Sequence, residues 1–172
     1  MNECMKVLIN RRSVKSYKPD AVPQELIEMV TEAGKNAPTG MNRQSPVMVA
    51  VTNPATLRTI SKLNAEILGT DNDPFYGAPC VIVVFADSTV RTYREDGSLV
   101  MGNLLNAASA LGLGSCWIHR AKEVFETEEG MKLKAKWGLG DEYVGIGNCI
   151  IGYPGTNPAP KAHKEDYVIY DN

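Results

Sequence analysis

In the first part of the chain, apolar positions recur three or four residues apart, the spacing of a helix that buries one face. At the N-terminus this pattern comprises Met1, Cys4, Met5 and Leu8. A second helix is expected after Pro23, a residue that suits a first helical turn. Its apolar face comprises Leu26, Val30, Ala33 and Ala37. The pattern predicts two amphipathic helices with a short basic segment between them.

Two unbroken apolar runs predict strands. Residues 46–52 (PVMVAVT) are compact and apolar, and residues 80–86 (CVIVVFA) are continuously apolar, as in a strand covered on both faces. Between them, Asn53 and Pro54 are typical of a helix N-cap and a first-turn proline, so a helix should follow. Residues 69–79 are rich in Gly, Asp, Asn and Pro and are expected to form a loop.

The second half of the chain begins with the most apolar helix. Residues 98–111 carry apolar side chains on most sides and small residues such as Gly102, which predicts a buried helix with a close neighbour. Gly112 and Gly114 then suit a helix C-cap and turn. Strands are expected at residues 115–119 and 144–153, with a charged helical region at 122–136 between them. This alternation of helices and strands implies an α/β layered domain.

Composition narrows the class of protein. The 172 residues should form one domain, with a net charge of −2 that argues against nucleic-acid binding. No run approaches the length of a membrane helix, and the N-terminus lacks the features of a signal peptide, so a cytoplasmic protein is expected. The four cysteines have no metal-ligand or disulfide spacing, and we expect free thiols and no metal site.

The usual catalytic and nucleotide-binding motifs are missing. GLGSCW and GIGNCI start like a dinucleotide fingerprint but lack its third glycine, and the chain has only two histidines. Three polar segments remain: RRSVKSYKPD from Arg11, NAPTGMNRQSP from Asn36, and PAPKAHKEDY near the C-terminus. The first could hold a phosphate, and the second could serve the polar edge of a planar heterocycle. Both could equally be solvated loops.

Taken in order, the motifs resemble the nitroreductase-like family of FMN-dependent oxidoreductases. The resemblance rests on RRSVKSY, APTGMNRQSP, FYGAPCVIVV, SLVMGNLLNAASALGLGSCWI and the closing GYP with a lysine-containing tail. It covers nearly the whole chain. It implies an α+β fold with a central, mostly antiparallel sheet flanked by helices. It also implies an intertwined homodimer with FMN at the interface, in which residues 98–111 are the best candidate for the central dimer contact.

The resemblance also assigns residues by position. The FMN phosphate and ribityl chain would be held by Arg11, Arg12 and Ser13, while Lys15 would stabilise negative charge at N1 of the ring. A loop of the partner subunit would meet the flavin through Pro38, Thr39, Gly40, Met41, Asn42 and Gln44. The end of the strand would pass the ring and offer backbone N–H near N5 through Trp117, Ile118, His119 and Arg120.

The tail departs from the family pattern. A Lys-x-Arg pair commonly contacts the phosphate, whereas this chain has Lys161, Ala162, His163 and Lys164 in succession. Histidine is a weaker and pH-dependent phosphate ligand. Lys161 is therefore expected at the phosphate together with either His163 or Lys164.

The resemblance implies an FMN-dependent NAD(P)H oxidoreductase with ping-pong transfer through flavin N5. NADH or NADPH would be the donor, and a nitroaromatic, quinone or similar small molecule the acceptor. The flavin would carry the chemistry, so no catalytic side chain is expected. Two alternatives stay open: an FMN-binding sensor or flavin store without turnover, and a specialised member acting on flavin or one dedicated metabolite.

Overall fold

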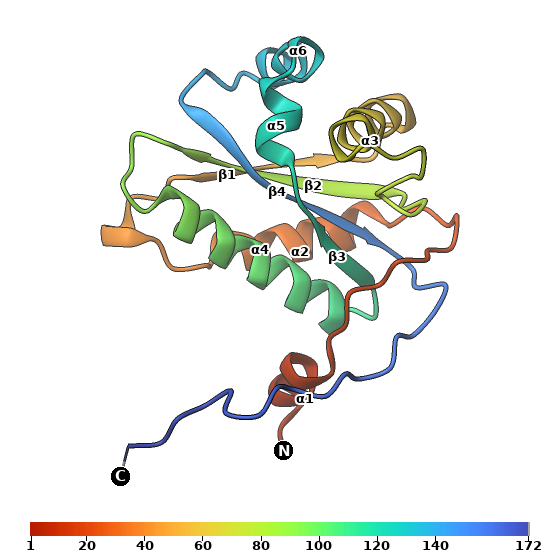
Figure 1. Cartoon of the computed structure of the whole chain (residues 1–172), viewed down its shortest axis with the longest axis vertical. Coiled ribbons are helices and arrows are strands. Elements are labelled where there is room, and N and C mark those ends of the chain that lie inside the picture. Colours follow the sequence, from red (N-terminus) through yellow and green to blue (C-terminus); the bar gives the residue numbers. More distant parts are fainter. Residues whose placement is uncertain (172) are drawn as a thin grey trace.

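A four-stranded antiparallel sheet separates two layers of helices (Figure 1). The computed structural model describes residues 1–171. The strands lie in the order β1 (Pro46–Val51), β2 (Cys80–Asp87), β4 (Tyr143–Gly152) and β3 (Gly114–Ile118). The α+β fold with an antiparallel sheet, expected from the sequence, is confirmed.

The helices cover both faces of this sheet. One layer consists of α2 (Gln24–Lys35) and α4 (Tyr93–Ala110), and the other of α3 (Pro54–Leu68), α5 (Ala121–Glu126) and α6 (Glu128–Lys136) (Figure 1). The short helix α1 (Glu3–Asn10) lies apart from both layers, beyond the end of α4. Within residues 1–171, none of the helices is long and apolar enough to cross a membrane.

Strand β2 divides the core into two apolar clusters. Its side chains alternate between the faces of the sheet, so Ile82 and Val84 pack toward α2 and α4 while Val83 and Phe85 pack toward α3 and α5. All four side chains are fully buried. A strand covered on both faces was predicted from the unbroken apolar run at 80–86, and the structure confirms it.

Several local signals act as predicted. The Asn53 side chain accepts hydrogen bonds from the N–H groups of Ala55 (3.0 Å) and Thr56 (3.1 Å), which caps α3. Gly112 follows α4 with φ of +73°, a left-handed conformation that glycine adopts without strain.

Two helix boundaries differ from the prediction. Helix α4 starts at Tyr93, five residues before Ser98, because its first turn is packed: Asp96 is buried and hydrogen-bonded. The charged region 122–136 is two helices, not one. It breaks at Thr127, whose side chain accepts from the Gly130 N–H (3.0 Å) and starts α6.

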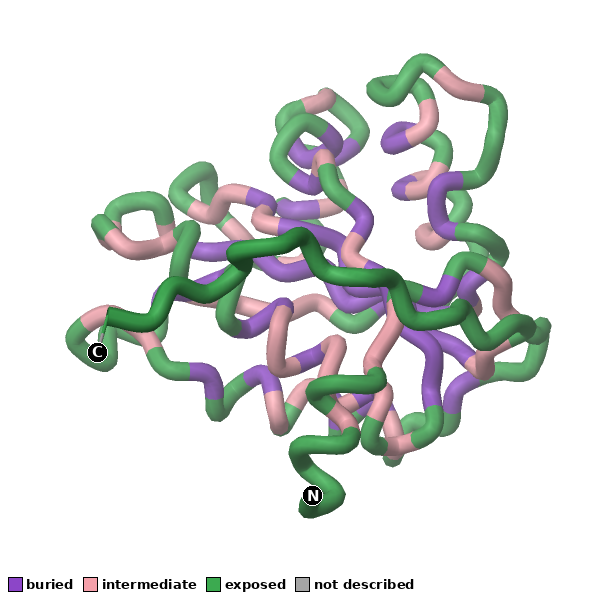
Figure 2. The backbone as a smooth tube through the Cα atoms, turned by 60° about the horizontal axis from the view of Figure 1, so that its bottom comes forward, coloured by how far each residue is buried: buried purple, intermediate pink, exposed green. Residues whose placement is uncertain are grey.

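Both ends of the chain lie on the surface of the single subunit (Figure 2). Helix α1 buries no residue, and the apolar side chains of Met5, Leu8 and Ile9 are exposed. After β4 the chain runs on as an extended tail in which Tyr167 to Tyr170 are also exposed. A sizeable apolar surface is thus left uncovered within one chain.

We expect Phe85→Ala to destabilise the fold more than any surface change. The Phe85 ring centroid lies 4.7 Å from that of Phe125 and 6.2 Å from that of Trp137. Removing it should lower the free energy of unfolding by about 3–5 kcal/mol in chemical denaturation. The exposed control Lys132→Ala should change it by less than about 0.5 kcal/mol. A loss below about 1 kcal/mol for Phe85→Ala would contradict this packing.

Candidate functional site

The basic segment after α1 is held against the sheet by backbone hydrogen bonds. The Val14 N–H donates to the carbonyl oxygen of Ser115 (3.0 Å), and the Lys18 N–H donates to that of Tyr153 (2.9 Å). Ser13 and Ser115 form a parallel bridge. Residues 13–18 therefore run beside the start of β3 and the residue that follows β4. This pairing fixes the positions of the basic residues before and after Val14.

Side-chain packing fixes the turn of this segment. The Tyr17 hydroxyl donates to the Val14 carbonyl oxygen (2.8 Å). Burial raises the pKa of Tyr17, so the hydroxyl keeps its proton and remains a donor over the whole working pH range. Gly114 permits the close approach, because a Cβ there would lie 2.9 Å from the Val14 Cβ. The join between the two segments is thus both hydrogen-bonded and tightly packed.

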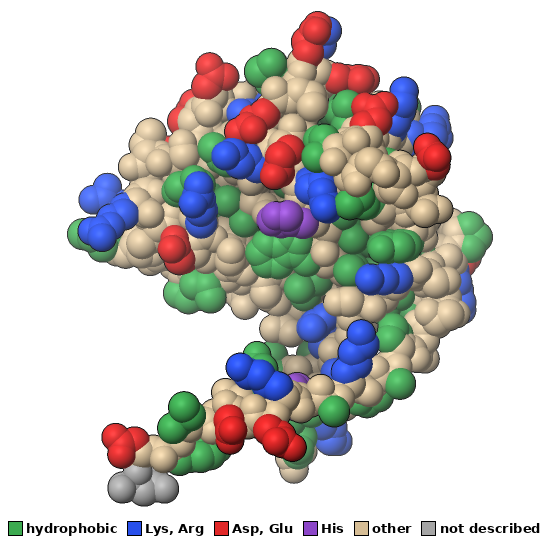
Figure 3. All heavy atoms as spheres, viewed as in Figure 1, with side chains coloured by type: hydrophobic (Ala, Val, Ile, Leu, Met, Phe, Trp, Pro, Cys, Tyr) green, Lys and Arg blue, Asp and Glu red, His purple; other side chains and the backbone are tan. Residues whose placement is uncertain are grey.

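A cavity of about 860 Å³ opens beside this join. The predicted site residues that line it come from three separate parts of the sequence: Arg11, Arg12, Ser13, Lys15, Trp117, Ile118, His119, Arg120, Lys161 and His163. Among the residues that the structure describes, no Asp or Glu lines it. Figure 3 shows Lys and Arg side chains around the hollow where the tail leaves the body. In a chain with net charge −2, such a cavity favours an anion.

Two arginine nitrogens in this cavity are buried without a partner within residues 1–171: Arg11 Nη1 and Arg12 Nε. Unpaired buried donors are costly and require an acceptor. Arg12 is already partly used, since its Nη1 donates to the carbonyl oxygens of Ile9 and Arg11 (both 2.8 Å). Arg12 thus holds the end of α1 in place, and Arg11 is left as the freer of the two for a bound anion.

The end of β3 enters the cavity in an unusual conformation. Arg120 has φ of +71°, a left-handed conformation that side chains disfavour. The carbonyl oxygen of the preceding His119 accepts a hydrogen bond from Asn64 Nδ2 (2.8 Å), on α3. The strand end is therefore held from behind by a buried side chain that the sequence did not single out.

The tail supplies the remaining cations. Lys161 and His163 line the cavity, whereas the Lys164 Nζ lies 5.7 Å from the centroid of the Tyr167 ring. Of the two alternatives for the second tail residue, the structure brings His163 rather than Lys164 to the cavity.

Other residues of the cavity were not predicted. Pro74, Tyr76 and Cys116 line it together with Asn64. Tyr76 has a left-handed backbone (φ +53°), and the Lys15 Nζ lies 5.8 Å from its ring centroid. Only Asn64 carried a signal in the sequence: it follows Ile60 by four residues, which places an amide on the buried face of α3.

The polar loop after α2 lies elsewhere. None of its predicted residues (Pro38, Thr39, Gly40, Met41, Asn42 and Gln44) lines the basic cavity of the same chain. Its shape is nevertheless firmly held. The buried carboxylate of Asp96 accepts from the Gly40 N–H (2.9 Å) and the Ser45 hydroxyl (2.8 Å), so it ties both ends of the loop to α4.

This loop carries unusual backbone strain. Met41, Asn42 and Gln44 all have positive φ, between 49° and 54°. Such conformations persist only where the surroundings impose them, and they cluster at binding sites. The Asp96 hydrogen bonds supply that constraint. The structure therefore shows a polar loop of fixed shape that does not line the basic cavity of its own chain.

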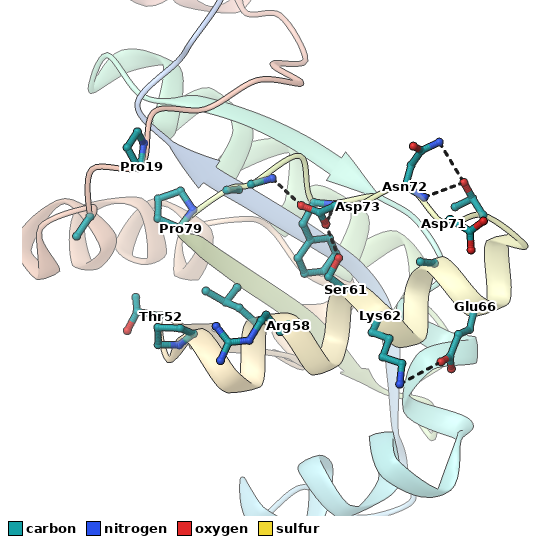
Figure 4. A pocket seen from close by; sticks show the side chains of 18 residues that line it. Pro19, Thr52, Arg58, Ser61, Lys62, Glu66, Asp71, Asn72, Asp73 and Pro79 are labelled. Atoms are coloured by element: carbon teal, nitrogen blue, oxygen red, sulfur yellow. Dashed lines mark hydrogen bonds and ion pairs between the residues drawn. The ribbon is translucent and has the colours of Figure 1, made fainter.

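A second cavity, of about 820 Å³, lies between α3 and the loop that follows it, residues 70–79 (Figure 4). Its polar groups largely satisfy one another: Lys62 pairs with Glu66 (3.7 Å), and Asp73 accepts from the Ser61 hydroxyl and from the Gly77 N–H (2.7 Å). Its charges are mixed in sign, and it holds no buried unpaired donor among the described residues. It is less suited to an anion than the basic cavity.

Comparison with known proteins identifies the family. The sequence profile of the nitroreductase family matches residues 8–70 and 66–153, which together span most of the chain. The chain belongs to the nitroreductase family. One relative, from Archaeoglobus fulgidus, is provisionally named an NADH dehydrogenase/NAD(P)H nitroreductase. It is 31% identical over 160 residues, covering 90% of this chain and 87% of the relative.

Solved nitroreductase structures share the fold. A nitroreductase with bound FMN from Desulfitobacterium hafniense superposes with a TM-score of 0.90 at 25% identity, and both chains are covered completely. Another with bound FMN, from Bacteroides fragilis, gives a TM-score of 0.91 at 22% identity, again over both whole chains. The family resemblance inferred from the motifs is confirmed, and the fold of this nitroreductase is that of its structural neighbours.

The three buried cysteines should be unreactive in the native nitroreductase. Burial raises the pKa of Cys116, and the nearby Ser13 hydroxyl and the charges of Lys15 and Arg11 offset only part of this effect. Burial also raises the pKa of Cys80 to about 12 and raises that of Cys149. Because the thiolate is the reactive form, little of it exists at pH 8.

The measurement is thiol labelling in a Cys4→Ser background, so that the signal comes from these three thiols alone. We expect no rapid modification at pH 8 in the native protein and full modification after unfolding. Rapid native labelling of Cys116 would contradict its assignment as a buried, protonated wall of the cavity.

Proposed function

We propose that the basic cavity binds FMN and that the protein is an FMN-dependent NAD(P)H oxidoreductase. The observation that carries the proposal is the buried, unpaired Arg11 Nη1 in a cavity lined by cations and free of carboxylates. A dianionic phosphate supplies the missing acceptors and balances the charge. The FMN-bound structural neighbours and the relative with an NAD(P)H-linked name support the same ligand and donor.

The residues of the cavity fit the parts of FMN. The size of about 860 Å³ is within the range of small-molecule sites. Arg11, Ser13 and Lys161 would hold the phosphate, with Arg12 and His163 beside them. Lys15 would lie at the pyrimidine edge of the ring, and residues 117–120 would present a backbone N–H to the ring. When bound, FMN would supply the redox chemistry by taking hydride from NADH or NADPH at N5 and passing electrons to a small acceptor.

We further infer that a second copy of the chain completes the site. The preformed loop from Pro38 to Gln44 lies away from the cavity of its own chain, and its polar groups suit the edge of a planar ring. Helix α1 and the tail also leave apolar surface uncovered. In an intertwined homodimer, the loop of one subunit would meet the flavin bound by its partner. Nitroaromatics or quinones are the expected acceptors, in a ping-pong sequence.

The same cavity also suits the two alternatives, an FMN-binding sensor or store and a member dedicated to one metabolite. One experiment separates them. Purified protein is loaded with FMN under anaerobic conditions and titrated with NADH or NADPH, and a nitroaromatic is then added. We expect the flavin absorbance to bleach and then return. Bound flavin that no pyridine nucleotide reduces would favour the binding protein, and failure to bind FMN would overturn the proposal.

Arg11→Ala should weaken binding of oxidised FMN. The substitution removes a charge-assisted contact to the phosphate, which is worth about 1.5–3 kcal/mol, or roughly one to two decades in dissociation constant. Fluorescence titration with FMN measures the change. Riboflavin, which lacks the phosphate, serves as the control ligand, and its affinity should be nearly unaltered. An equal loss for both ligands would show that Arg11 does not contact the phosphate.

Lys15→Ala should act on the reduced state instead. Its cation would stabilise the negative charge that reduction places at N1, so the variant should still bind oxidised FMN. The preference for reduced over oxidised FMN should fall about tenfold, which lowers the potential of the two-electron couple by about 30 mV. Potentiometric titration checks this. An unchanged potential would make Lys15 a surface residue.

Gly102→Leu should break the dimer and leave the subunit folded. In the single chain, nothing lies within 4 Å of a Cβ built at Gly102, so leucine fits there and also favours the helix. If α4 is the central dimer contact, the added side chain clashes with the partner. Sedimentation should show a dimer for the wild type and for the control Glu66→Leu on α3, and a monomer for Gly102→Leu. A wild-type monomer that binds FMN would overturn the dimer.

A further inference from the structure

Two buried asparagines converge on one peptide at the end of β3. Asn64, on α3, and Asn148, on β4, are both fully buried. The Nδ2 of Asn64 donates to the His119 carbonyl oxygen (2.8 Å). The Nδ2 of Asn148 lies 3.3 Å from the Ile118 carbonyl oxygen and 3.5 Å from that of His119. Side chains from two different elements therefore hold the same short stretch of backbone.

These amides are expensive groups to bury. The Oδ1 atoms of Asn64 and Asn148 are buried and find no donor within residues 1–171. An unsatisfied buried oxygen costs about 1–3 kcal/mol, so an apolar residue of similar size would serve the core better. Asparagine at both positions is therefore poorly explained by stability alone. The two residues share one feature: the Nδ2 groups of both donate to the His119 carbonyl oxygen.

Holding a carbonyl also orients the N–H that follows it. The peptide between His119 and Arg120 is trans and planar, so its C=O and N–H point in opposite directions. With the oxygen held toward α3 and β4, the Arg120 N–H faces away from both asparagines. No acceptor for it occurs among the described residues, although it lies beside the basic cavity. The left-handed φ of Arg120 keeps the chain in this arrangement.

We propose that Asn64 and Asn148 are positioning residues that lock the 119–120 peptide so that its N–H, and not its carbonyl oxygen, faces the flavin. This inference rests on the proposed function. In the proposal neither asparagine acts by binding the ligand. Both are fully buried, and although Asn64 borders the cavity, its amide N–H donates to the His119 carbonyl oxygen. They act through the orientation of one peptide, which two donors fix more firmly than one.

The orientation has a defined effect on the flavin. In oxidised flavin N5 accepts a hydrogen bond, whereas after reduction it carries a hydrogen and becomes a donor. A peptide N–H facing N5 therefore favours the oxidised state, and a carbonyl oxygen there would favour the reduced state. The oriented peptide and Lys15 therefore have opposite effects on the potential of bound FMN, because the Lys15 cation favours the reduced state. Releasing the lock should raise the potential of bound FMN, while removing Lys15 should lower it.

The test uses full-length, FMN-loaded protein and the variants Asn64→Leu and Asn148→Leu, which remove the donors and keep the volume. In each, the preference for reduced over oxidised FMN should rise about tenfold, which is about 30 mV for the two-electron couple. The Arg120 amide should exchange with solvent at least tenfold faster in FMN-loaded variants than in the wild type. Asn64→Gln, which keeps an amide donor, should restore part of both properties.

Ile60→Val is the matched control. Ile60 is fully buried on the same face of α3, one turn before Asn64, so its variant loosens the core without touching the peptide. In Ile60→Val, the potential of bound FMN and the exchange rate of the Arg120 amide should match those of the wild type. If both asparagine variants bind FMN with unchanged potential and exchange, the inference is overturned and the proposed function stands. If the wild-type protein does not bind FMN, both the inference and the proposed function are overturned.

If the asparagine variants fail to fold, the inference can still be tested on the wild-type protein through its Arg120 amide. Adding FMN to wild-type protein should shift the Arg120 amide signal and slow its exchange. An Arg120 amide that is unaffected by bound FMN would overturn the inference, whatever the variants do.

Discussion

The hydrogen bond between the Val14 N–H and the Ser115 carbonyl oxygen is the contact on which the site depends. It joins the basic segment near the N-terminus to a strand a hundred residues later. Around it, the arginines before Val14, the end of β3 after Ser115 and the tail beyond β4 become walls of one cavity. Cations this close together repel one another unless a ligand neutralises them. The cavity therefore favours an anionic ligand, whose charge would balance that of the cations.

A second constraint concerns what lies outside that cavity. The buried Asp96 carboxylate holds the strained loop from Gly40 to Ser45 in one shape, yet that loop lines no part of the basic cavity of its own chain. Backbone strain of this kind clusters at binding sites, so the loop is best explained as making a contact outside its own subunit. The exposed apolar side chains of α1 and of the C-terminal tail are consistent with such a partner surface. We propose that the cavity of one subunit and the loop of its partner form one site, which a single subunit cannot complete.

The sequence predicted those features that depend on local chemistry. The cap at Asn53, the left-handed Gly112 and the doubly covered strand at 80–86 each follow from a few neighbouring residues. The break at Thr127 and the early start of α4 were missed, because a buried Asp96 and a close-packed Gly130 are tertiary facts. The family resemblance singled out Arg11, Lys15 and Lys161, which the structure brings to one cavity. Tyr76 and the asparagines behind Arg120 became visible only in three dimensions.

The central claim is that each site is shared between two subunits, and hybrid dimers test it most directly. Arg11→Ala damages only the cavity, and the double variant Asn42→Ala, Gln44→Ala damages only the loop, so each homodimer should bind FMN weakly. When the two are unfolded together and refolded, every hybrid dimer contains one undamaged cavity facing one undamaged loop. Roughly a quarter of all sites should then bind FMN with wild-type affinity. A mixture with no tight sites would show that cavity and loop of the same chain serve the same flavin.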